Sequence, residues 1–178
     1  MQVRADAQKI WQQAISAVQP EAAVRRALQN AAFSGRVHLV AIGKAAWPMA
    51  SAAYETLGSK IADGIVITKY HHSRGPIGNL QIFEAGHPVP DENSYAATRA
   101  AVELVKPLGE GDEVLFLVSG GGSALFESPL ISEDEMADVT NQLLACGADI
   151  VEMNTIRKRL SCVKGGKFAE LASPAKVF

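Results

Sequence analysis

The spacing of apolar residues along the chain alternates between two patterns, one typical of buried strands and one typical of helices. Short apolar runs at residues 36–43, 63–69, 80–86 and 113–118 read as buried strands, each ended by glycine or a polar residue. Between them, apolar positions recur at three- and four-residue steps, as in helices. This alternation predicts βαβ units. We expect one α/β domain over residues 1–178, with a doubly wound parallel sheet and helices on both faces, a Rossmann-like three-layer αβα fold, and residues 113–118 as its central strand.

Helix signals flank these strands. Residues 5–18 carry an apolar stripe that includes Ile10, Trp11 and Ile15, which predicts an amphipathic helix. Pro20 opens a second helix that reaches Gln29. Further helices are expected after Ala46 through about Leu57, from about Ser94 to Val105, from the capping box at Ser132 to Ala145, and from Asp149 to Leu171 with a break at Gly165-Gly166. A last strand is expected to start near Pro174.

The strand at residues 113–118 leads into a glycine-rich loop, Ser119 to Ser123. Glycines allow positive φ and let a ligand approach the backbone. Consecutive backbone N–H groups in such a turn form a concave anion site, and a helix behind it would add its dipole. The alternative is a flexible Gly/Ser linker, but a linker is typically flanked by polar residues on both sides.

Polar clusters follow the other three strands as well. They are Gly43-Lys44, residues 69–74 and residues 86–91. Because the carboxyl ends of parallel strands meet at one edge of a sheet, we expect all of these loops to line one ligand crevice. Lys44 would be a cation for phosphate or carboxylate, or a surface lysine. The GxxxxGK[ST] and GxGxxG motifs are both absent from the sequence.

Two other groups of residues are candidates with competing interpretations. His87 could accept a proton, orient Asp91, or cap a strand. Asn154, Arg157 and Lys164 belong to a basic stretch in which Arg157 and Lys164 would lie two turns apart on one helix side, forming a second anion-binding edge or a solvated face. His71 and His72 have no further ligands at metal spacing, so no metal site is predicted.

Composition narrows the function classes. Of the 178 residues, 48% are hydrophobic and 20% charged, which is typical of a globular protein, and the formal charge of -2 without a basic run argues against nucleic acid. The sequence lacks a signal segment and a long apolar run, so we expect no membrane span. Cys146 and Cys162 are expected to be free thiols. The predicted location is the cytoplasm.

Four motifs in order resemble those of the MOFRL-type glycerate 2-kinases, some of which carry hydroxypyruvate reductase names. They are Gly43-Lys-Ala-Ala46, Gly86-His-Pro-Val-Pro-Asp91, Ser119-Gly-Gly-Gly-Ser-Ala124 and the stretch from Asn154 to Gly166. The resemblance covers nearly the whole chain, with departures at Arg159, Cys162 and Phe168. It implies transfer of phosphate from ATP to D-glycerate with Mg2+, a cleft between two domains, and a chain that holds the amino-terminal domain only.

The resemblance also assigns site residues and partners. Lys44 becomes the catalytic cation, and the substrate- or phosphate-binding candidates are His87, Asp91, Ser119, Gly120, Gly121, Gly122, Ser123, Asn154, Arg157 and Lys164. The expected partners are D-glycerate, ATP, the second domain of the same chain and, in a homo-oligomer, further copies. The alternatives are a nicotinamide-dependent hydroxypyruvate reductase, which would need a dinucleotide turn, and a non-catalytic anion-binding module.

Overall fold

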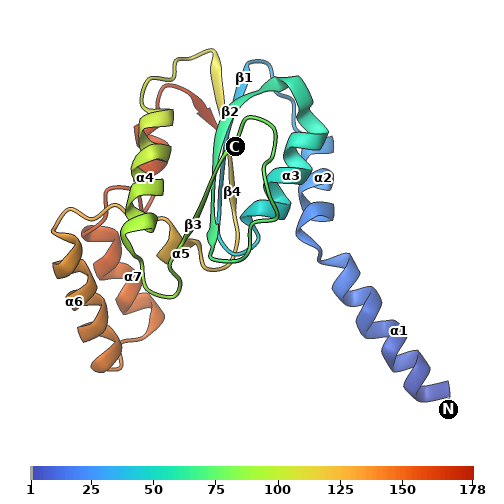
Figure 1. Ribbon diagram of the computed structural model, residues 1–178, viewed down its shortest axis with the longest axis horizontal. Helices are drawn as coiled ribbons and strands as arrows, with labels where there is room; N and C mark the ends of the chain where they lie inside the picture. Colours follow the sequence, from blue (N-terminus) through green and yellow to red (C-terminus); the bar gives the residue numbers. More distant parts are fainter. Residues whose placement is uncertain (1) are drawn as a thin grey trace.

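The computed structural model describes residues 2–178 as a five-stranded parallel sheet in the order β3-β2-β1-β4-β5 (Figure 1). The α/β prediction is confirmed. The central strand is β1, however, and the expectation that residues 113–118 would be central was wrong. Their apolar run reflects helices packed on both faces, while the neighbouring β5 is only two residues long. The strands are β1 Arg36–Ile42, β2 Ile61–Lys69, β3 Gln81–Ala85, β4 Asp112–Val118 and β5 Lys176–Val177.

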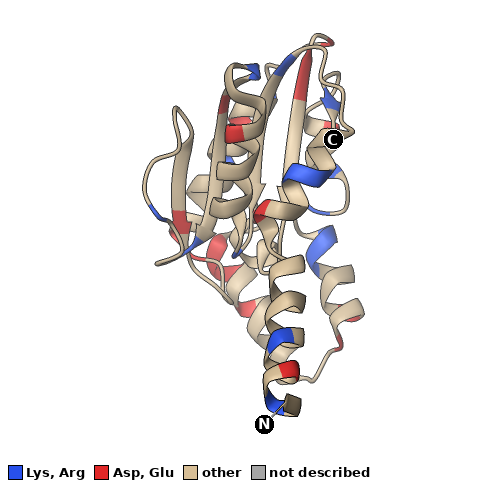
Figure 2. Cartoon of the chain, turned by 90° about the vertical axis from the view of Figure 1, so that its right-hand side faces the viewer, with Lys and Arg blue, Asp and Glu red and all other residues tan. Residues whose placement is uncertain are grey.

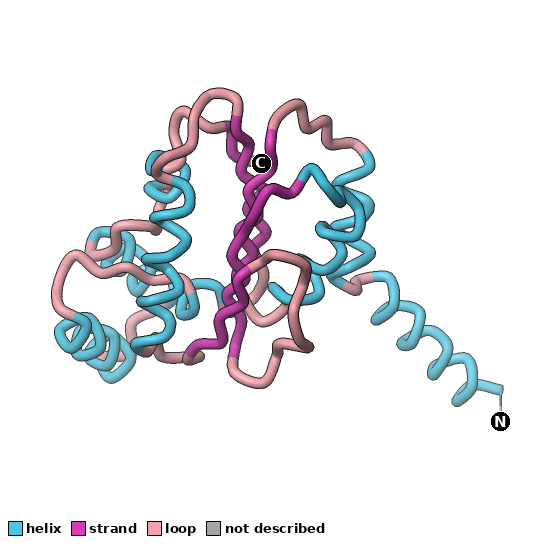
Figure 3. Tube along the Cα trace, turned by 45° about the horizontal axis from the view of Figure 1, so that its top comes forward, coloured by secondary structure: helices cyan, strands magenta, loops and turns pink. Residues whose placement is uncertain are grey.

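Helices cover both faces of the sheet, which confirms the three layers (Figure 3). One hydrophobic cluster joins α2 and α3 to β1 through residues such as Val24, Ala50 and Leu39. A second cluster joins α4 and α8 to the opposite face through residues such as Ala101 and Phe168. The helices are α1 Gln2–Ala17, α2 Pro20–Gln29, α3 Ala46–Leu57, α4 Glu92–Val105, α5 Gly122–Leu125, α6 Glu133–Ala145, α7 Ile150–Arg159 and α8 Lys167–Leu171, with a 3-10 turn at Gly58–Lys60.

Helix α1 forms as the apolar stripe predicts, but the stripe is not buried. No residue of α1 is buried, and Ile10 and Trp11 remain 67% and 53% exposed. The helix projects away from the sheet in two views (Figures 1 and 2). Figure 2 also shows basic and acidic residues interspersed over this side of the molecule.

Helices α6 and α7 begin at the caps that the sequence indicates. Ser132 and Asp149 each form a capping box with the glutamate three residues later. The helix expected over residues 149–171 stops at Arg159, well before the glycine pair. Residues 160–162 instead pair with residues 128–130, because Leu130 N donates to Leu160 O and Cys162 N donates to Ser128 O at 2.7 Å.

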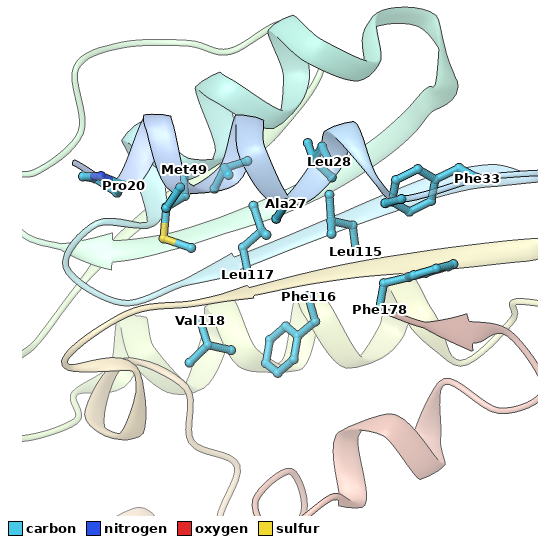
Figure 4. Close-up of a pocket in the computed structure, with 13 residues that line it drawn as sticks. Pro20, Ala27, Leu28, Phe33, Met49, Leu115, Phe116, Leu117, Val118 and Phe178 are labelled. Carbon is cyan, nitrogen blue, oxygen red and sulfur yellow. The ribbon is translucent and has the colours of Figure 1, made fainter. Parts of the chain in front are cut away.

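An apolar hollow of about 510 Å³ lies between α2 and β4 (Figure 4). Its wall includes Leu28, Phe33, Leu117 and Phe178, and it contains none of the predicted site residues. A surface without charged groups is unsuited to phosphate, so the candidate site is elsewhere. Among residues 2–178, no helix combines the length and the apolar character needed to traverse a bilayer.

Candidate active site

The loops after β1 and β4 meet where the strand order reverses. These two strands are hydrogen-bonded neighbours, but β1 leads into α3 on one face and β4 leads into α5 on the other. The loops therefore diverge and leave a crevice at the carboxyl edge of the sheet, which is where open α/β sheets bind ligands. The two sequence motifs Gly43-Lys44 and Ser119–Ser123 thus lie side by side.

Ser119 ties these two loops together. Its backbone N–H and its hydroxyl both donate to Ile42 O, at 2.9 and 3.1 Å, and its Oγ accepts from Ala45 N at 3.0 Å. Lys44 N donates to Gly120 O at 2.8 Å. Because the Ser119 hydroxyl is engaged as donor and acceptor, its role in the structure is to brace the crevice.

The glycines of the crevice differ in backbone conformation and in the space that a side chain would have. Gly43 has φ +109, and a Cβ there would lie 2.5 Å from Ser119 O. Gly121 has φ +90, and a Cβ there would lie 2.9 Å from the His87 ring. Gly120 has open space, with the Lys44 Cε as nearest neighbour at 3.9 Å. Gly43 and Gly121 are required by the fold, whereas Gly120 leaves room beside Lys44.

Two backbone donors point to what that room can hold. Within residues 2–178, the N–H groups of Gly120 and Gly121 donate to no protein acceptor, whereas those of Ser119 and Gly122 donate to Ile42 O and Ser119 O. Consecutive free N–H groups beside an ammonium group are suited to an anion. The helix expected behind the loop is the single turn α5, which is too short to contribute much dipole.

His87 packs against Gly121 on the same side as Lys44. Burial lowers the pKa of His87, and the positive charges of Lys44 and Lys69 lower it further. The imidazole is therefore neutral at neutral pH, and one ring nitrogen is free to accept a hydrogen bond or a proton. A neutral histidine beside a cation leaves the local charge positive.

Asp91 has a different position from the one expected of a substrate ligand. It is the N-cap of α4, accepting from Ser94 N at 2.9 Å and from Tyr70 Oη at 2.7 Å. Burial alone would raise the pKa of Asp91, but the hydrogen bonds from Tyr70, the Gly86 backbone and Ser94 outweigh it, so the pKa is lowered. The carboxylate is occupied in holding the 86–91 loop.

Arg157 and Lys164 turn inward onto Glu127, whose side chain is fully buried. Arg157 Nη2 lies 3.2 Å from the Glu127 carboxylate, and Lys164 Nζ lies at the same distance. Both cations also donate to Ser123 O, at 3.0 and 2.7 Å, and Lys164 donates to Phe126 O at 2.7 Å. The two cations act as an anchor for the end of the glycine-rich loop.

Burial lowers the pKa of Lys164 to about 8, despite the opposing attraction of Glu127. All three N–H groups of its ammonium have acceptors in the protein. The prediction that Arg157 and Lys164 lie two turns apart on one helix is wrong, because α7 ends at Arg159 and the chain folds back. Sequence reasoning did not find Glu127, whose only signal is an acid within the apolar run 124–130.

Asn154 lies beside a smaller hollow of about 260 Å³ next to the glycine-rich loop. Ser123 and the exposed Lys158 border the same hollow. Lys158 belongs to the basic stretch recognised in the sequence, but it was not singled out as a site residue. This hollow adjoins Gly122, so it is continuous with the crevice loops and not a separate site.

The carboxylates near the crevice do not form a cation site. Asp91 is held by Tyr70 and Ser94, and Glu127 by Arg157 and Lys164. Within the described range 2–178, no group of three or more His, Cys, Asp or Glu side chains could hold a metal ion. The donor set of this domain alone does not fit Mg2+, which prefers several free oxygen ligands.

This geometry defines a class of protein: a doubly wound α/β domain with a cationic, glycine-rich crevice at its topological switch point. A family model described as "Domain of unknown function (DUF4147)" matches residues 6–178. The chain therefore belongs to the DUF4147 family.

Several similar proteins have names that state an activity. D-glycerate 2-kinase of Thermotoga maritima is 57% identical over 171 residues, covering 95% of this chain and 41% of the relative. Glycerate 2-kinase of Pyrococcus horikoshii is 43% identical over 141 residues, covering 78% of this chain and 31% of the relative. A protein of Agrobacterium vitis with a hydroxypyruvate reductase name is 42% identical over 172 residues, covering 95% of this chain and 39% of the relative.

Two solved structures share the fold. The crystal structure of the glycerate kinase of Thermotoga maritima superposes with a TM-score of 0.93 at 55% identity, over 99% of this chain and 43% of that one. The crystal structure of the PH0495 protein of Pyrococcus horikoshii superposes with a TM-score of 0.87 at 37% sequence identity. The match covers 98% of this chain and 42% of that one. These matches confirm the resemblance to glycerate 2-kinases, and this chain spans about two fifths of the length of the relatives.

Proposed function

We propose that the protein transfers phosphate from ATP to D-glycerate, giving 2-phosphoglycerate, and that this chain is the amino-terminal domain of that kinase. The observation that carries the proposal is the pair of free N–H groups at Gly120 and Gly121 beside the exposed Lys44. The 57% identity to a D-glycerate 2-kinase supports the same reaction.

The chemistry fits phosphoryl transfer, in which positioning and charge neutralisation supply most of the catalysis. Lys44 and the two N–H groups would hold a phosphate or carboxylate group, and neutral His87 beside them can accept a hydrogen bond. Mg2+ would neutralise the ATP phosphates, and its ligands would come from ATP and from outside residues 2–178. A cytoplasmic location accords with ATP as substrate and with the free thiols of Cys146 and Cys162.

The test is release of ADP from ATP with D-glycerate, measured on the complete protein. We expect turnover in the unchanged protein and a loss of at least about 100-fold in kcat/KM for Lys44→Ala, because a preorganised charge at the reacting group is removed. Lys106→Ala is the matched control, since this exposed lysine at the far end of α4 pairs with the exposed Glu103.

Three outcomes would contradict the proposal. Wild-type turnover in Lys44→Ala, with an unchanged circular dichroism spectrum, would remove Lys44 from the site. Oxidation of NADH with hydroxypyruvate, without ADP release from D-glycerate, would favour the reductase. Binding of glycerate without either reaction would favour a non-catalytic module.

A further inference from the structure

The exposed large apolar side chains of residues 2–178 lie toward one end of the molecule, the end at the carboxyl edge of the sheet. They lie on α1, on α6 and α7, and in the loops at the carboxyl edge of the sheet. The loops at the opposite edge, around residues 30–36, 58–61 and 106–112, contribute none of them. The members are Val3, Ile10, Trp11, Ile15, Val18, Tyr70, Val89, Val118, Leu130, Leu144, Ile150, Val151 and Ile156. Exposed apolar surface that is concentrated at one end of a protein is typical of an interaction surface.

Helix α1 supplies the first part of this surface. It has sixteen residues and none of them is buried, although Ile10, Trp11 and Ile15 form one apolar stripe. An isolated helix of this length is marginal in water, and most helical stability comes from packing an apolar face. The stripe therefore calls for a partner that residues 2–178 do not provide.

The pair α6–α7 supplies the second part. Leu144 is 57% exposed and Val151 69% exposed. Val151 borders a hollow of about 540 Å³ between the end of α6 and α7, together with Leu143 and Ile156. In Figures 1 and 3, α1 and the α6–α7 pair extend on opposite sides of the sheet, and both extend toward its carboxyl edge.

The solved relative shows that the projecting helix is part of a shared architecture. The match to the Thermotoga maritima structure takes in 99% of this chain at a TM-score of 0.93, so α1 is aligned with the rest. More than half of that longer chain lies outside the match. The position of α1 is thus kept in a protein that has further polypeptide available to cover it.

We propose that α1 and the α6–α7 pair are two docking surfaces for the second domain of the same polypeptide, which bridges them across the crevice. This inference rests on the proposed two-domain kinase. An occupant that reaches both surfaces must cross the carboxyl edge, and so it covers Lys44 and Gly120. A second domain in this place excludes water from phosphoryl transfer, whereas a second copy of this chain in the same place would obstruct the crevice.

Hydrogen–deuterium exchange on the complete protein tests this assignment. We expect the amides of α1 to exchange at least about 100-fold more slowly than in an unstructured peptide, because docking supplies the packing that α1 lacks. Ile15→Asp places a charge in the apolar stripe and should return α1 to fast exchange. Ser16→Asp, one residue along and on the opposite face of α1, should leave its protection unchanged.

The α6–α7 surface is tested by a second matched pair. Leu144→Asp should raise exchange in α6 and α7, and Ala145→Asp, its exposed neighbour in the same turn, should not. Fast exchange of α1 in the unchanged protein overturns the proposal. Protection that disappears on dilution, together with a dimeric mass by light scattering, assigns the surface to a second copy and overturns it too. Both readouts are independent of kinase activity.

Discussion

At the scale of single residues, Gly120 and Gly121 are adjacent but differ in what a side chain would meet. Gly121→Ala forces an alanine to φ +90 and brings its Cβ against His87. We expect a loss of about 1–2 kcal/mol in the free energy of unfolding, with reduced activity. Urea denaturation measures the first effect and ADP release the second.

Gly120→Ala is the matched partner of that variant. Its Cβ finds only the end of the Lys44 side chain, 3.9 Å away. We expect a free energy of unfolding within about 0.5 kcal/mol of the unchanged protein, together with weaker anion binding. Equal destabilisation of the two variants would show that the space beside Gly120 is not open.

Lys164 makes stability depend on pH. Its pKa is about 8 in the folded protein, below the ordinary 10.5, so between these values the unfolded chain binds more protons than the folded one. Stability from this group therefore rises with pH, by about 2 kcal/mol between pH 7 and pH 9.5. The measurement is the difference in urea stability between the unchanged protein and Lys164→Met at the two pH values. A difference that stays constant or falls would contradict the assigned shift.

At the scale of elements, Glu127 joins the loop after α5 to α7 and to the turn before α8. Glu127→Gln keeps the shape but leaves Arg157 and Lys164 without a buried counter-charge. We expect a loss of about 3 kcal/mol in the free energy of unfolding. Glu133→Gln is the control, because its pair with Arg99 is exposed and contributes little. Equal stabilities of the two variants in urea would show that the cluster does not anchor these segments.

The local elements were predictable, and their long-range contacts were not. The strand periods and the capping residues Ser132 and Asp149 specify the start of each element through contacts within a few residues. Periodicity identified the apolar stripe of α1 but not what would cover it. The break after Arg159 depends on pairing with residues 128–130, which no local pattern encodes.

The candidate site was predictable to a similar extent. The rule that loops meet at the carboxyl edge brought Lys44 and the glycine-rich loop together. That rule could not predict which polar side chains would form hydrogen bonds and ion pairs within the domain instead of facing a ligand. Asp91 is consumed by the N-cap of α4, and Arg157 and Lys164 by a buried acid thirty or more positions away in the sequence.

At the scale of the whole molecule, residues 1–178 hold one side of the proposed cleft. We expect this stretch alone to show no measurable ADP release with D-glycerate, while its circular dichroism spectrum shows the mixed helix and strand content of a folded α/β domain. The coupled assay on the stretch and on the complete protein, at equal concentration, makes the comparison. Comparable turnover by the stretch alone would refute the need for a second domain.

The divergence of the β1 and β4 loops has a consequence for cooperativity. Each loop is the entry to a different hydrophobic layer, α2–α3 on one face and α4–α8 on the other. An anion held by Lys44 from the first loop and Gly120 from the second would contact the polypeptide of both layers at once. Unfolding of either layer would then release the anion. The free energy of anion binding therefore stabilises both layers against local unfolding.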